Sequence, residues 1–197
     1  FAHDGANGRD DIRARSGERR IGSALMNPAR EIATRNAGGS NRAADASTQI
    51  DAFLDKYTPE MASAARRARA RMRKQIPGGV EFVYDNYNAL VFGYGPSDRP
   101  SEAVVSLAIM PKWVTLCFLK GTKLADPKKL LKGSGSTVRN VRLIPPLTLD
   151  DAEVQRLIDA AIAAARPPFP VGKAAPSTIV KSISAKQRPR RPRTEIS

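Results

Sequence analysis

The sequence has one cysteine and one histidine among 197 residues, and this scarcity excludes several kinds of site. The histidine, His3, lies near the N-terminus, so neither a Ser/His/acid triad nor a Cys/His pair can be assembled in a central core. The usual zinc sites are excluded because they need about four Cys or His ligands. Cys117 cannot form an intramolecular disulfide. Its place in the apolar run WVTLCFL predicts a buried thiol in a reducing compartment.

Long hydrophobic runs are also lacking. No apolar stretch approaches the roughly 18 residues that a membrane-spanning helix needs, and the first residues lack the apolar core of a secretory signal. We therefore expect a cytoplasmic protein that has no membrane partner. Aromatic residues make up 6% of the chain and apolar residues 41%, so the core is expected to be mostly aliphatic and alanine.

The net charge of +14 is unevenly distributed along the chain. Residues 1–45 carry 8 basic and 6 acidic side chains, residues 46–165 carry 17 and 12, and residues 166–197 carry 8 and 1. Half of the excess positive charge therefore lies in the C-terminal segment. Such a balance favours attraction to nucleic acids and other anions, but it does not define a fold.

Composition divides the chain into three parts. Residues 1–45 contain scattered glycines and no periodic apolar stripe, which predicts a disordered lead. Met26 is an alternative start of the protein within that lead. Residues 46–165 carry the apolar patterns of a folded domain, and residues 166–197 form a basic tail that contains prolines. Residues 178–183 of the tail alternate enough to add a strand to a sheet edge.

Two helices are predicted at the start of the domain. The apolar residues from Ile50 to Tyr57 have helical spacing. Thr58 and Pro59 then provide the N-cap and the first turn of a second helix, which ends before Pro77. The second helix has basic residues at positions 66, 67, 69, 71, 73 and 74. These residues form either a solvated face or a basic ridge for phosphates.

Short runs rich in Val, Phe, Tyr and Leu follow, and they predict strands over residues 80–84, 89–92, 103–110, 113–119 and 138–143. Pro111 and Lys112 leave a two-residue turn between the third and fourth runs, so these two strands should form an antiparallel hairpin.

Two further helices are predicted from their capping residues. Asp126 and Pro127 predict a short helix that ends before Gly133. Thr148 and Asp151 resemble a capping box and predict a helix that runs to Ala165. The expected fold is therefore α+β: an antiparallel sheet of about five strands packed against two N-terminal helices and one C-terminal helix.

The run from Pro111 to Leu143 resembles the signature segment of the YdhG-like family. The features that carry the resemblance are, in order, Trp113, Leu124, Asp126, Pro127, the leucine pair before Gly133, Gly135 and the strand over 138–143. The resemblance covers roughly residues 50–165. It implies a YdhG-like α+β domain, in a family whose biochemical role is largely undefined. We interpret such a domain as a non-enzymatic binding module.

The YdhG-like fold is similar to the frataxin superfamily, in which an acidic helical edge is associated with iron handling. The resemblance alone implies iron as a cofactor, and the residues themselves predict none. Asp51 and Asp55, one helical turn apart, are the candidate metal ligands, and a solvated helix face is the alternative explanation. The arginine-rich second helix departs from the family pattern, because it would repel a cation.

A glycine-rich loop is the first candidate binding site for an anionic ligand. It contains Lys132, Gly133, Ser134 and Gly135, and Arg139 and Arg142 follow it. Backbone N–H groups of such loops can cradle an anion, although the lysine and the spacing of a P-loop are missing. A plain tight connection is the alternative. Arg139 and Arg142 should emerge on opposite faces of a strand, because they are an odd number of positions apart.

Aromatic residues suggest a pocket mouth beside Arg142. Its candidate lining residues are Tyr84, Asn86, Tyr87 and Trp113, with Asn88, Phe92 and Tyr94 nearby in the sequence. Packing within the core and across strands is the alternative role of these aromatic residues. An enzyme would need a general base there, and Glu81 or Asp85 could provide one if a pocket surrounded either carboxylate.

The tail supports a hypothesis of a different class. Its basic residues Lys186, Arg188, Arg190, Arg191 and Arg193 form a flexible arm that could neutralise nucleic-acid phosphates. No aromatic residues are interleaved with them, so such binding would be nonspecific, and a solubilising tail is the alternative. The leading hypothesis is a binding module for a small anionic ligand, a metal or a protein. The second is a nonspecific nucleic-acid-associated protein.

Overall fold

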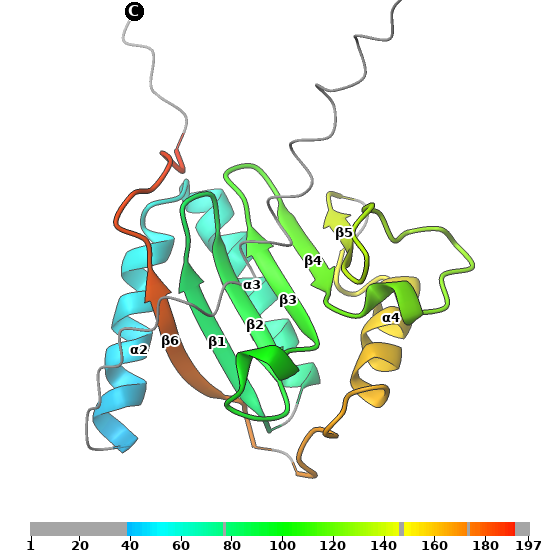
Figure 1. Ribbon diagram of the computed structural model, residues 1–197. Coiled ribbons are helices and arrows are strands. Elements are labelled where there is room, and N and C mark those ends of the chain that lie inside the picture. The colour runs from blue at the N-terminus through cyan, green and yellow to red at the C-terminus, as the bar shows by residue number, and fades with distance from the viewer. Residues whose placement is uncertain (1–38, 77, 146–147, 173, 192–197) are drawn as a thin grey trace, which may run out of the picture.

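The computed structural model describes residues 39–76, 78–145, 148–172 and 174–191. Within these ranges, three α-helices accompany a six-stranded sheet (Figure 1), which confirms the α+β class predicted from the sequence. Met26 and most of the predicted lead lie outside the described residues. The end of that lead was wrongly predicted, because residues 39–45 belong to a helix.

The first two helices are α2, Gly39–Leu54, and α3, Pro59–Gln75. The start of α3 is the one predicted: the Thr58 hydroxyl accepts a hydrogen bond from the backbone N–H of Met61 at 3.3 Å, and proline occupies the first helical position. Helix α2 begins well before the apolar stripe that predicts it, because alanine-rich sequence extends the helix toward the N-terminus.

The strands are β1 Val80–Asp85, β2 Leu90–Gly95, β3 Val105–Ile109, β4 Val114–Phe118, β5 Arg139–Leu143 and β6 Ser177–Ile183. Their order in the sheet is β5-β4-β3-β2-β1-β6. The first five strands pair with antiparallel neighbours, and the predicted hairpin of β3 and β4 is present. Strand β6 comes from the tail and pairs with β1 in parallel, which makes it the second edge of the sheet.

The last helix, α4, spans Ala152–Ala163. Its N-cap is Asp151, whose carboxylate accepts hydrogen bonds from the N–H groups of Glu153 and Val154, so the helix begins later than Thr148 predicted. The short helix predicted after Asp126 is absent from the described residues between β4 and β5. Asp126 instead closes a turn that includes Lys129, whose φ of 54° cannot continue a right-handed helix.

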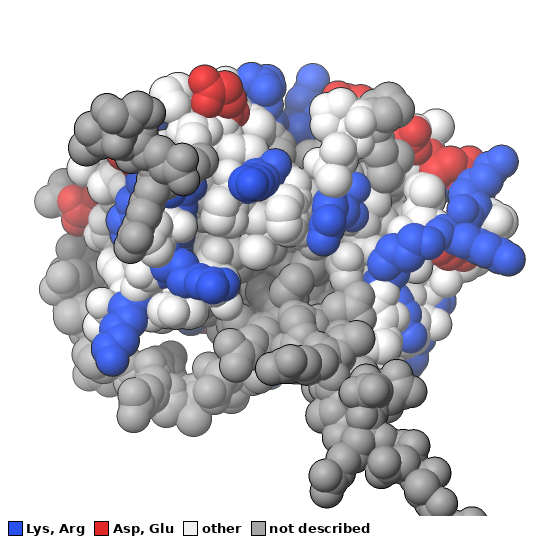
Figure 2. Space-filling model, turned by 90° about the horizontal axis from the view of Figure 1, so that it is seen from above, with Lys and Arg blue, Asp and Glu red and all other residues white. Residues whose placement is uncertain are grey.

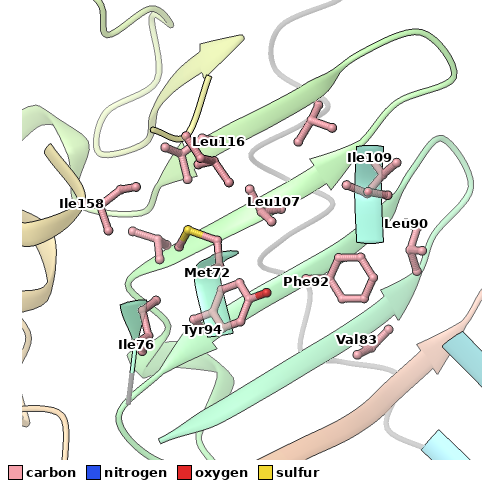
Figure 3. Close-up of a cluster of buried hydrophobic side chains, with 14 of the residues drawn as sticks. Met72, Ile76, Val83, Leu90, Phe92, Tyr94, Leu107, Ile109, Leu116 and Ile158 are labelled. Carbon is pink, nitrogen blue, oxygen red and sulfur yellow. The ribbon is translucent and has the colours of Figure 1, made fainter. Parts of the chain in front are cut away.

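The main core lies between the sheet and all three helices. Figure 3 shows part of it: Met72 and Ile76 of α3 lie among Leu107, Leu116 and Tyr94 of the sheet, and Ile158 of α4 approaches from the side of β4. Cys117 points to the opposite face of the sheet, is buried as expected, and has a pKa that burial raises to about 12. It is therefore a protonated, inert thiol at neutral pH.

Tyr57 links the connection between the two helices to the middle of the sheet. Its hydroxyl donates a hydrogen bond to the carbonyl of Ile109 at 2.8 Å and accepts one from the N–H of Leu90 at 2.9 Å. Burial raises the pKa of this hydroxyl to about 12, so it remains a donor at every physiological pH.

We expect Tyr57→Phe to lower the free energy of unfolding by about 2 kcal/mol, because it leaves one buried donor and one buried acceptor without a partner. Urea unfolding followed by circular dichroism measures the change. Tyr87→Phe is the matched control, since Tyr87 is 47% exposed, and it should change stability little. Equal stability of the two variants would contradict the prediction.

Candidate functional site

Two buried carboxylates lie on the helix-facing side of β1. Glu81 and Asp85 are both 0% exposed, and their spacing of four residues along a strand places them on the same face as Val83. A carboxylate can be buried only when cations and hydrogen-bond donors surround it. Cations and hydrogen-bond donors from distant parts of the chain surround each of the two carboxylates.

Glu81 is surrounded by donors from three elements. Arg69 makes a two-pronged contact, with Nε 2.9 Å from Oε1 and Nη2 2.8 Å from Oε2, and Arg73 Nη1 lies 2.7 Å from Oε2. The hydroxyls of Tyr94 and Thr178 donate at 3.1 and 2.8 Å. We refer to these five residues as the Glu81 cluster. It connects α3 to the three neighbouring strands β2, β1 and β6.

Burial by itself would raise the pKa of Glu81. The guanidinium groups of Arg69 and Arg73 outweigh that effect and hold the pKa below its ordinary value. Burial and the neighbouring carboxylate raise the pKa of Tyr94 well above its ordinary value. Glu81 is therefore ionised and Tyr94 protonated at neutral pH. A general base requires the opposite shift of the carboxyl pKa, so the cluster has the properties of a structural ion pair.

Asp85 is held by a different set of partners. Lys56 Nζ lies 2.6 Å from Oδ2, Arg190 Nη1 lies 2.6 Å from Oδ1, and the Gln187 side chain donates to Oδ2 at 2.6 Å. Two of these three partners come from the C-terminal tail.

Neither set of partners is predicted by the sequence. The alternation of VEFVYD places the two acids on one strand face, and Arg69 and Arg73 are one helical turn apart. Only the tertiary structure brings strand and helix together, however.

Most arginines of α3 have acidic or polar partners instead of forming a free basic ridge. Arg71 contacts Asp150 at 2.7 Å and Gln155 at 2.8 Å, and Arg66 contacts Asp51 at 3.1 Å. Together with the Glu81 cluster, these contacts compensate much of the charge of the helix. The hypothesis of a phosphate-binding ridge on α3 loses its support, because the cations are already paired.

The candidate metal ligands Asp51 and Asp55 both face Arg66, at 3.1 and 3.9 Å. Their position beside a cation is unfavourable for a metal ion. Within the described ranges, no group of three or more His, Cys, Asp or Glu residues is arranged to hold a metal.

The candidate pocket residues lie apart from one another: near the turn between β1 and β2, beside Trp113, and in the core. Tyr84 lies near the end of β1, and Asn86 and Tyr87 belong to the turn that follows it. Trp113 belongs to the turn between β3 and β4 at the same end of the sheet (Figure 1), three strand spacings or roughly 14 Å away. Arg142 stacks on Trp113, with its guanidinium carbon 4.2 Å from the ring centroid.

The glycine-rich loop lies at the other end of the sheet, because Arg139 pairs with Phe118 and Leu143 with Val114. Phe92 and Tyr94 are buried in the core, as the alternative explanation held. The structure therefore does not bring all the predicted ligand-binding residues to one place.

The carbonyl oxygens of the glycine-rich loop accept hydrogen bonds from a nearby arginine side chain. The Arg139 guanidinium donates to the carbonyls of Gly135 and Val138, and the Lys132 ammonium donates to the carbonyl of Lys129 at 3.0 Å. The loop therefore turns carbonyl oxygens toward Arg139, whereas an anion cradle would present N–H groups. Arg139 and Arg142 alternate to opposite faces of β5, as expected.

The tail residues differ from one another in accessibility. Lys186 and Arg188 are exposed, Arg190 is 3% exposed, and Arg191 donates to the backbone carbonyls of Tyr57 and Asp55. The prediction of a solvated arm is therefore wrong for Arg190, which is buried, and Arg191 is held on the domain by backbone carbonyls, whereas Lys186 and Arg188 are exposed as predicted. Arg193 lies outside the described residues.

A group of exposed positive charges lies between β4 and β5. Residues 119–143 contain five lysines, two arginines and one acid. All five lysines are exposed, whereas Asp126 is half-buried and accepts hydrogen bonds from the N–H groups of Leu130 and Leu131. We refer to Lys120, Lys123, Lys128, Lys129 and Lys132 as the lysine surface. In Figure 2, basic side chains project from the right of the molecule, the side on which Figure 1 draws this connection.

Comparison with protein-family models, with curated proteins and with solved structures found no match. Among the described residues, the helices are too short or too polar to cross a bilayer.

We expect Glu81→Gln to lower the free energy of unfolding by about 3 kcal/mol at pH 7, because it leaves two partly buried guanidinium groups without their anion. The pKa of Glu81 is lowered in the folded state. Its stabilisation is therefore complete above the ordinary pKa of 4.5 and is lost as the pH falls through the folded-state value. The variant should lack this part of the acid dependence.

Urea unfolding measured from pH 7 to pH 3 tests the prediction. Asp98→Asn is the control, because it removes the same charge from an exposed side chain. A Glu81→Gln variant with the stability and the pH profile of the control would show that the cluster does not stabilise the fold.

Proposed function

We propose that this chain is a binding module for an anionic, phosphate-bearing ligand, and that the lysine surface between β4 and β5 makes the contact. The proposal keeps the YdhG-like interpretation of a non-enzymatic cytoplasmic module. It moves the contact from the glycine-rich loop to the lysines around it. One observation carries the proposal: the lysines of this connection are exposed, and none of them forms an ion pair within the described part of the chain.

The contrast with α3 supports this choice. Arg66, Arg69, Arg71 and Arg73 each lie within 4 Å of a carboxylate. Among the described residues, Lys120, Lys123 and Lys128 form no ion pair or side-chain hydrogen bond. An incoming phosphate therefore does not need to displace an internal partner from these lysines, and it gains the attraction of several positive charges at once.

The backbone that carries the lysine surface is held in place. Lys132 and Asn140 exchange two backbone hydrogen bonds of 2.8 Å, and Thr122 donates to Thr137 at 3.1 Å. A side chain at Gly121 would place its Cβ 2.6 Å from the Cβ of Arg139. Glycine therefore permits the segment that follows β4 to lie close to the start of β5. The lysine positions are therefore arranged before a ligand arrives, which reduces the entropy lost on binding.

Lysine ammonium groups act as point charges and do not select a particular geometry. The expected ligand is therefore recognised by the density of its phosphates, and its affinity should fall as salt increases. A single-stranded oligonucleotide and inorganic pyrophosphate are suitable probes, because they separate a polymeric from a small phosphate ligand.

The double variant Lys123→Gln/Lys128→Gln should weaken binding of a labelled single-stranded oligonucleotide. The logarithmic salt slope should become shallower by about 1.4, because two phosphate contacts are lost. Fluorescence anisotropy across a salt series measures this slope, and a pyrophosphate titration by calorimetry tests the small ligand.

The matched control is Arg67→Gln/Lys74→Gln, which removes the same charge from exposed residues of α3. It should leave the salt slope near that of the unmodified chain. If the two double variants weaken binding equally, only net charge matters and the lysine surface is not the site. If the unmodified chain binds neither probe at low salt, the proposed function is wrong.

A further inference from the structure

The end of β1 and Tyr57, in the connection between α2 and α3, form a socket that is filled by an arginine of the tail. The Arg190 side chain is buried, its Nη1 lies 2.6 Å from Asp85 Oδ1, and its Nη2 donates to the carbonyl of Asn86 at 2.6 Å. Its guanidinium carbon lies 5.1 Å from the centroid of the Tyr57 ring. We refer to Tyr57, Asp85 and Asn86 as the arginine socket. An anion, a carbonyl and an aromatic face are the groups that recognise a guanidinium.

Weaker contacts surround the socket and hold the segment on either side of Arg190. The N–H of Ser184 donates to the carbonyl of Asp85 at 2.8 Å, and the N–H of Arg188 donates to the carbonyl of Tyr87 at 2.9 Å. Gln187 spans Lys56 and Asp85 with its amide group. In Figure 1 this segment, drawn in red, leaves β6 and turns back toward the top of α2.

The fit between the socket and its occupant is incomplete. Among the described residues, Nε and Nη1 of Arg190 and Oδ1 of Asp85 have no partner with hydrogen-bond geometry, although Nη1 and Oδ1 form a close ion pair. Buried donors without an acceptor reduce the stability of the docked state. A competing anion outside the socket therefore needs to supply less free energy to draw the arginine out.

We propose that the arginine socket is a guanidinium-binding site that controls how many cations of the tail are available to phosphates. In the docked state, Arg190 is paired with Asp85 and Arg191 with backbone carbonyls, so two of the four described basic residues after β6 are withheld. When the segment is released, both arginines join Lys186 and Arg188 on one flexible arm. The basic arm expected from the sequence is in this view the released state.

The availability of Arg190 to trypsin tests the socket without any phosphate ligand. Trypsin must take the Arg190 side chain into its own pocket to cut the Arg190–Arg191 bond, and proline follows both Arg188 and Arg191, so those bonds resist cleavage. Mass spectrometry of the full chain during limited digestion measures the rate at this bond. We expect Asp85→Asn to raise the rate at least tenfold. The control Asp150→Asn, which removes the same charge from an exposed acid, should not.

Because Asp85→Asn could also unfold the chain, Gln187→Ala is a second variant. It removes the two partly buried hydrogen bonds from the Gln187 amide to Asp85 and leaves the ion pair of Arg190 with Asp85 intact. We expect a smaller increase of the same cleavage, with the cut at Lys186 changing less than the cut at Arg190. If Gln187→Ala and Asp150→Asn digest identically, or if the unmodified chain is cut at Arg190 as fast as at Lys186, the socket does not hold the tail and the proposal is wrong.

The second arm of the test rests on the proposed function and uses the same oligonucleotide. Release of Arg190 and Arg191 should steepen the logarithmic salt slope of Asp85→Asn by about 1.4 relative to Asp150→Asn. Faster cleavage with an unchanged slope would overturn the control of phosphate binding. Absence of oligonucleotide binding in every variant would refute the proposed function, while the digestion still decides whether the socket exists.

Discussion

The two carboxylates buried on β1 are the constraint on which much of this structure depends. An ionised acid inside a protein is tolerated only when cations and donors compensate for the water it has lost. Glu81 obtains them from α3, β2 and β6, and Asp85 obtains them from the end of α2 and from the tail. The same contacts that satisfy two charges therefore attach the helices and the C-terminal strand to the sheet.

This arrangement also decides which positive charges remain available. The chain carries 33 basic and 19 acidic residues, but the pairing is uneven in space. Four arginines of α3 are directed toward acids, and Arg190 and Arg191 of the tail toward an acid and carbonyls, where the planar guanidinium can make two contacts at once. The lysines between β4 and β5 form no ion pair with any acid in the described ranges. Composition gives the total charge of the chain. The fold decides which cations are paired, and the lysine surface consists of cations that stay exposed.

Local chemistry was sufficient to predict much of the architecture. Thr58 and Pro59 define the start of α3, and the two-residue turn at Pro111 defines the hairpin, because each involves only neighbours in the sequence. The short helix after Asp126 was wrongly predicted for a related reason. Its capping residues also suit a turn, and only the packing of Leu130 and Leu131 on the core favours the turn.

The sequence by itself determined the α+β class, the positions of most strands, the scarcity of histidine and cysteine, and the excess of positive charge. Periodicity and composition contain this information because it concerns residues close together in the chain. Only the tertiary structure decided that Glu81 and Asp85 are buried, that Arg190 fills a socket whose residues Asp85 and Asn86 lie more than 100 positions earlier in the chain, and that the predicted pocket residues are separated. Burial and long-range pairing depend on which elements meet, and no local pattern encodes that.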